Sequence, residues 1–146
     1  MNNYEGIQII ESILAIEGNL GMKLEALRIL PQLTNPRTYK EISRIVQISI
    51  ENVDIEVIRN GLLIIQHLPP NFASRSLINA LIEKLNAQDT DIQYHAIFSL
   101  LHLQGQILPK KLCFCIQPLT EHPNKILRAA AREAVQMLAA SKDNKK

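Results

Sequence analysis

The sequence contains no tryptophan, only three tyrosines and three phenylalanines, and only five glycines among its 146 residues. So few aromatic residues argue against a surface that stacks nucleic-acid bases, because such surfaces use aromatic side chains. No apolar run approaches the 18 or more residues of a transmembrane helix, so no membrane span is expected. The first residues, MNNYEGIQIIESIL, have neither a basic region nor a small-residue cleavage site, and we therefore expect no secretion signal.

Cysteine is also scarce. Cys113 and Cys115 lie two residues apart in one predicted helix, on different faces, so they are not placed to form a disulfide. A reduced, cytoplasmic protein fits this usage best.

Charge of neither sign dominates. Residues 1–60 carry eight acids and six bases, whereas residues 61–146 carry six acids and ten bases, for a net charge of +2. The basic half has no dense stripe of Lys and Arg, so a nucleic-acid partner is not expected.

Residue patterns that would indicate catalysis are missing. The chain has no Gly-rich phosphate loop, no Gly-x-Ser-x-Gly turn and no His-Glu-x-x-His helix. His67 and His102 occupy equivalent places in successive repeats, but no carboxylate at metal-ligand spacing accompanies them. The sequence therefore predicts a protein that is not an enzyme and that holds no metal or cofactor.

What the sequence does have is an internal repeat of 35 residues. Counting from Met22, Val57, Ile92 and Leu127 as position 0, the period is 35 residues in all three steps, without a gap. Positions 0, +4, +7, +8 and +11 are apolar or small in all four units. On a helix these positions form one stripe about 100° wide, which must be covered by something apolar.

The segment before each stripe keeps the same spacing, as Ile7, Ile42, Leu77 and Leu112 show. Each unit therefore consists of two helices. The first helices are predicted over 5–16, 38–49, 74–86 and 109–120, and the second helices over 21–34, 55–68, 90–104 and 124–140. Breakers such as EGNLG, TNPR, HLPPN and EHPN separate them.

One helix pair cannot shield both of its flanks, so successive pairs must stack. Small residues at position +4, which are Ala26, Gly61, Ala96 and Ala131, would let the helix axes approach closely. We predict an all-α fold, an α-solenoid of four stacked two-helix repeats that forms a single domain over residues 1–141. Residues 142–146 would form a basic, flexible tail.

The segment KILRAAAREAVQML, together with DTDIQ and DIEV at the start of the two preceding second helices, resembles the HEAT-like repeat. It is most similar to the short repeats of phycobilisome-lyase-type proteins. The resemblance implies a solenoid. It also implies an accessory or chaperone subunit of a bilin lyase, or of another pigment-protein assembly system, as one function.

Positions +2, +5, +6 and +9 point away from the stripe, onto the face that HEAT-like arrays leave as a concave groove. In the first three units this face is largely apolar, and an extended apolar surface usually marks an interaction site. The predicted partner-binding residues are Leu27, Arg59, Leu62, Leu63, Tyr94, Ile97, Phe98 and Leu101. The same pattern would arise if neighbouring second helices bury these side chains, or if the helix phase is shifted by one residue.

Two functions follow. The first is a non-catalytic interaction module or assembly factor that holds another protein, or a second copy of itself, along the groove. The second is the pigment-assembly function that the resemblance implies. A HEAT-like DNA glycosylase is disfavoured, because it would need a cationic groove with aromatic stacking.

Overall fold

The computed structural model describes residues 2–143, and all regular secondary structure in that range is helical, with no strand, which confirms the all-α prediction. Short 3-10 turns, among them Leu30–Leu33 and Gln117–Glu121, extend some of the helices. The eight α-helices are α1 (Asn3–Ala15), α2 (Leu20–Ile29), α3 (Tyr39–Ile50), α4 (Ile55–Ile65), α5 (Arg75–Lys84), α6 (Thr90–His102), α7 (Pro109–Ile116) and α8 (Lys125–Asp143). Helix α8 continues two residues into the predicted tail, and residues 144–146 of that tail lie outside the described residues.

Capping side chains explain where most helices begin. Asp54 accepts a hydrogen bond from the backbone N–H of Glu56, and Asp89 accepts from those of Asp91 and Ile92. Each cap satisfies a donor that the first helical turn leaves without a partner. The same role falls to Asn2 at α1, Ser74 at α5 and Asn124 at α8.

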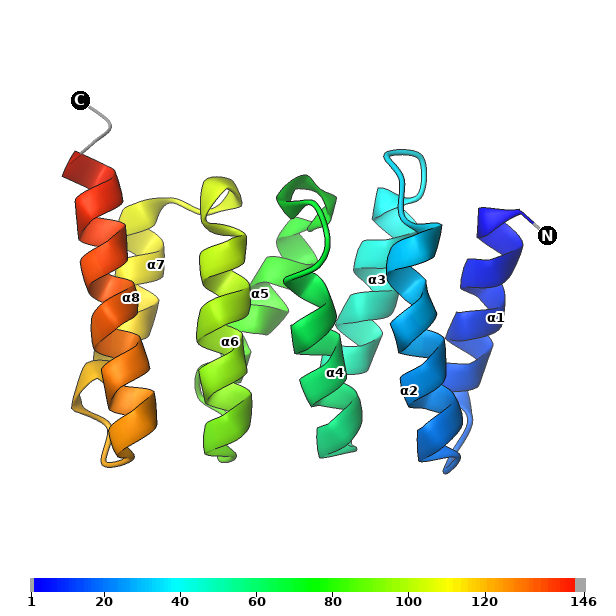
Figure 1. Ribbon diagram of the computed structural model, residues 1–146, viewed down its shortest axis with the longest axis horizontal. Coiled ribbons are helices and arrows are strands. Elements are labelled where there is room, and N and C mark those ends of the chain that lie inside the picture. Colours follow the sequence, from blue (N-terminus) through cyan, green and yellow to red (C-terminus); the bar gives the residue numbers. More distant parts are fainter. Residues whose placement is uncertain (1, 144–146) are drawn as a thin grey trace.

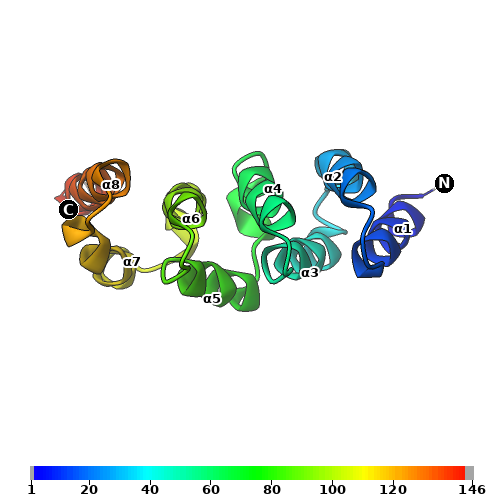
Figure 2. The ribbon, with the colours of Figure 1, turned by 90° about the horizontal axis from the view of Figure 1, so that it is seen from below.

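The helices alternate between two rows. The odd-numbered helices form one row and the even-numbered helices form the other, with α1 and α8 at opposite ends (Figures 1 and 2). In the even-numbered row, here called the second row, each helix contacts the next one along the chain. Each second-row helix also packs on the odd-numbered helix that precedes it.

Most of the predicted stripe lies in the core in α4, α6 and α8, although Val135, at position +8 of α8, is half-buried. Position 0 is buried at Val57, Ile92 and Leu127, and position +4 is buried in all four units. In α2 the prediction is wrong for Met22 and Ile29, which are 51% and 39% exposed. No described helix precedes α2 in the second row, so nothing among residues 2–143 covers that side.

The small residue at position +4 of the second unit allows a close helix contact. A Cβ atom built on Gly61 would lie 2.2 Å from Ser49 Oγ and 3.0 Å from Ile50 Cγ2, both on α3. The absence of a side chain at Gly61 therefore sets the distance at which α4 packs on α3.

Within residues 2–143, no helix is both long enough and apolar enough to cross a membrane.

Candidate interaction surface

Four of the eight residues predicted to bind a partner belong to the core instead. Leu27, Leu62 and Ile97 are fully buried, and Leu101 is 8% exposed. The prediction that these four side chains line an open groove is wrong.

For Leu27, Leu62 and Ile97, which all hold position +5, the reason is the contact between successive second-row helices. The Ser99 hydroxyl, at position +7 of α6, donates a hydrogen bond of 2.7 Å to the carbonyl oxygen of Leu62, at position +5 of α4. Position +5 points about 140° away from position 0. It is therefore outside the stripe that faces the first row but directly against the next second-row helix. Neighbouring helices widen the buried arc, as the alternative interpretation of the sequence allowed.

The other four predicted residues are at least partly exposed. Arg59 and Leu63 lie one turn apart on α4, and Tyr94 and Phe98 hold the same two positions, +2 and +6, on α6. Leu63 is 36% exposed, while Tyr94 and Phe98 are half-buried against the core. We call these four residues the α4–α6 patch.

The two aromatic rings of the patch pack on each other. Their centroids are 4.9 Å apart and their planes are tilted by 57°. Such a pair is favourable beyond the area that it buries, by about 0.5–1.5 kcal/mol. The contact also restricts the rotamers of both rings.

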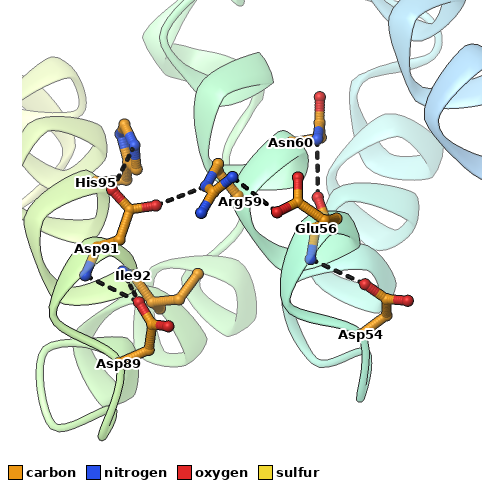
Figure 3. A network of polar contacts seen from close by, with 8 residues as sticks. All are labelled: Asp54, Glu56, Arg59, Asn60, Asp89, Asp91, Ile92 and His95. Atoms are coloured by element: carbon orange, nitrogen blue, oxygen red, sulfur yellow. Dashed lines mark hydrogen bonds and ion pairs between the residues drawn. The ribbon is translucent and has the colours of Figure 1, made fainter.

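Arg59 is held by acids on two helices (Figure 3). Its Nε donates to Asp91 Oδ2 on α6 at 2.5 Å, and its Nη1 donates to Glu56 Oε1 on α4 at 2.8 Å. His95 Nε2 lies 3.4 Å from the other carboxylate oxygen of Asp91. The hydrogen bond to Asp91 raises the pKa of Arg59 above the ordinary arginine range, so the guanidinium stays charged at any pH used to handle a protein.

This network is a surface feature and stabilises the fold only modestly. The Arg59 and Asp91 side chains are 34% and 43% exposed, so water screens their attraction. Exposed ion pairs of this kind contribute about 0.2–1 kcal/mol. The main effect of the network is to link α4 to α6 within the α4–α6 patch and to occupy the Arg59 donors.

The sequence interpretation missed Ile126, which is 70% exposed at the start of α8. A pocket of about 190 Å³ opens between α6 and α8, lined by Thr90, Asp91, Tyr94, Asn124, Ile126 and Leu127. Ile126 stands one residue before position 0, where the second and third units carry Glu56 and Asp91. The replacement of an acid by isoleucine at this exposed position is the sequence signal that indicates an apolar surface here. The pocket extends the apolar surface from Tyr94 towards α8.

Side chains with reactive or metal-binding chemistry are dispersed. Among the described residues, no group of three His, Cys, Asp or Glu side chains is placed to hold a metal ion. Cys113 and Cys115 are both free thiols and half-buried. His102 Nε2 lies 2.6 Å from the carbonyl oxygen of Leu68, which gives that ring a structural partner.

Comparison with known proteins gives no match, either to a family model or to a curated protein sequence.

Proposed function

We propose that the protein is a non-catalytic interaction module that binds another protein across its second row of helices. The α4–α6 patch and Ile126 form the contact surface. The observation that carries this function is the exposure of Leu63 on α4 together with the half-buried ring pair of Tyr94 and Phe98 at the equivalent positions of α6. Packing between neighbouring helices covers position +5 but leaves Leu63 exposed and the two rings half-buried.

The fold that suits this role is an α-solenoid of four stacked HEAT-like repeats of 35 residues. Three features support it: the alternation of the helices between two rows, the burial of the same positions in successive units, and the contact of each second-row helix with the next. Stacked repeats present an extended face on which one element from each unit contributes side chains. We place such a module in the cytoplasm.

The expected occupant is an amphipathic helix of another protein. Interface energy concentrates in a few aromatic or large apolar anchors surrounded by polar groups. Here Tyr94 and Phe98 are the aromatic anchors, Leu63 and Ile126 extend the apolar surface, and the Arg59 network forms a charged edge. A helix lying on this row would meet apolar groups from α4, α6 and α8, which matches helix-in-groove recognition.

The test is the double variant Leu63→Ser and Phe98→Ser, purified from cells alongside the wild type. Quantitative mass spectrometry of the co-purifying proteins should show the partner reduced about thirtyfold, because truncating a central anchor often costs about 2 kcal/mol or more. The matched control is Phe114→Ser on α7, where the ring is 81% exposed and belongs to the other row. This control should keep the partner.

Retention of the partner by a folded double variant would contradict the assignment of the surface. Phe98 is half-buried, so a second variant with Leu63→Asp and Ile126→Asp changes only exposed side chains and guards against loss of folding. Visible absorbance after co-expression with bilin synthesis would instead support the pigment-assembly function.

A further inference from the structure

The outer sides of α2 and α8, at the two ends of the second row, differ in polarity and charge, and the repeat positions show why. Within the row, positions 0 and +7 of a helix lie towards the preceding unit, and position +5 lies towards the following unit. The hydrogen bond from Ser99, at +7, to the Leu62 carbonyl, at +5, marks this arrangement. The exposure of Met22 and Ile29 in α2 agrees with it.

The outer side of α2 keeps its apolar residues. Met22 and Ile29 hold positions 0 and +7, which are buried in the other three units, and no described residue covers them. Glu25 lies between them at position +3, with its side chain 67% exposed. We call Met22, Glu25 and Ile29 the α2 end face. Stacked repeats bury their apolar faces against a neighbouring unit, so an exposed apolar face of this kind can receive another unit.

The outer side of α8 carries positive charge where the other units carry leucine or isoleucine. Arg132 holds position +5, which is occupied by Leu27, Leu62 and Ile97 in the preceding units. Its side chain is 55% exposed, and its Nε donates a hydrogen bond of 3.0 Å to the carbonyl oxygen of Thr120. Beside it, Val135 is half-buried and Ala139 is exposed. We call Arg132, Val135 and Ala139 the α8 end face.

We propose that a second copy of this chain docks its α2 end face on the α8 end face, so that copies associate head to tail. Within one chain, position +7 of a second-row helix packs on position +5 of the preceding second-row helix. The same contact would then recur between two chains. It places Ile29 of one copy beside the aliphatic stem of Arg132 in the other copy. Glu25 lies one helical turn from Ile29, which brings its carboxylate within reach of that guanidinium.

Charge complementarity selects this pairing over the symmetric ones. Residues 2–37 carry four acids and three bases, a net charge of −1, whereas residues 109–140 carry two acids and five bases, a net charge of +3. Joining two α2 end faces would oppose Glu25 to Glu25, and joining two α8 end faces would oppose Arg132 to Arg132. Like charges placed together across an interface are strongly unfavourable.

Forming the contact between two chains would break two ion pairs, one within each chain, at little cost in free energy. Glu25 pairs with Arg28 of its own helix at 2.8 Å, and Arg132 lies 4.0 Å from Glu121. All four side chains are more than half exposed, and such pairs contribute little to stability. A head-to-tail contact also leaves one free end on each side, so the association is open-ended unless its rotation closes a ring.

The test is sedimentation velocity of the full chain over a range of protein and salt concentrations. The weight-average mass of the wild type should rise with protein concentration, pass that of a dimer, and fall as salt screens the charges. Glu25→Arg or Arg132→Glu alone should weaken association at least about tenfold. Both substitutions in one chain should restore it, because the charge pair is then reversed but still complementary.

Matched controls reverse charges elsewhere. Glu83→Arg and Arg75→Glu change exposed residues of α5, remote from both end faces, and should leave association unchanged. A wild type that stays monomeric at about 1 mM protein in low salt overturns the inference. An assembly that does not grow beyond a dimer and whose mass is unaffected by Arg132→Glu also overturns it. The same holds if the double reversal does not restore association. None of these results depends on the α4–α6 patch, so they do not bear on the partner proposed above.

Discussion

Replacing Leu62 with alanine is expected to lower the free energy of unfolding by about 2–5 kcal/mol. Leu62 is fully buried on the side of α4 that faces α6, so truncation leaves a cavity between two second-row helices. The adjacent change, Leu63→Ala, removes a side chain that is 36% exposed and should cost about 1 kcal/mol or less. Urea denaturation monitored by circular dichroism measures the free energy of unfolding of both variants and of the wild type.

The comparison of these two neighbours is a test of helix phase. The same chemical change is made one residue apart, so helix propensity and side-chain volume cancel. Equal losses, or a larger loss for Leu63→Ala, would show that α4 is rotated relative to the structure described here and that the α4–α6 patch is assigned to the wrong residues.

Replacing Gly61 with alanine is expected to destabilise the protein by about 1–3 kcal/mol, the usual cost of overpacking. The new Cβ atom would lie 2.2 Å from Ser49 Oγ, and that hydroxyl is buried and held by a 2.6 Å hydrogen bond to the Val46 carbonyl oxygen. In an exposed helix interior the same change stabilises by about 1 kcal/mol, so the sign of the effect reports the close contact.

Gly21 supplies the matched control, because it also lies in a helix but has no atom within 4 Å of a built Cβ. Gly21→Ala should leave stability unchanged or raise it by up to about 1 kcal/mol. In a Ser49→Ala background the penalty of Gly61→Ala should shrink, since the nearest remaining Ser49 atom, Cβ, is 3.2 Å away. If Gly61→Ala stabilises the protein as Gly21→Ala does, the close packing of α3 on α4 is wrong.

The helices themselves could be predicted from the sequence because their signals are local. The predicted second helix over 90–104 corresponds to α6 and the 3-10 turn that follows it, and the first helix over 38–49 corresponds to α3. Caps such as Asp54 and Asp89 stand at the predicted starts. The small residue at position +4 also indicated a close contact, and the surroundings of Gly61 agree with it.

The surface could not be predicted as well, because exposure depends on the neighbours of a helix and not on the helix alone. A stripe about 100° wide describes one helix packed on one partner. Contacts along the second row extend the buried arc to Leu62 and Ile97, while the uncovered side of α2 exposes Met22. Leu63 and Phe98 stay at the surface because position +6 lies beyond the reach of these contacts.

Thiol labelling of single cysteines in the native protein tests the central claim most directly, namely that stacking of second-row helices buries position +5 and leaves position +6 open for a partner. Cys113 and Cys115 are first replaced by serine, and Leu62→Cys and Leu63→Cys are then compared. We predict that the thiol at position 62 reacts at least about thirtyfold more slowly, which requires an opening free energy of only about 2 kcal/mol. Equal rates, or faster reaction at position 62, would contradict the stacking of α4 on α6 and the interaction surface built on it.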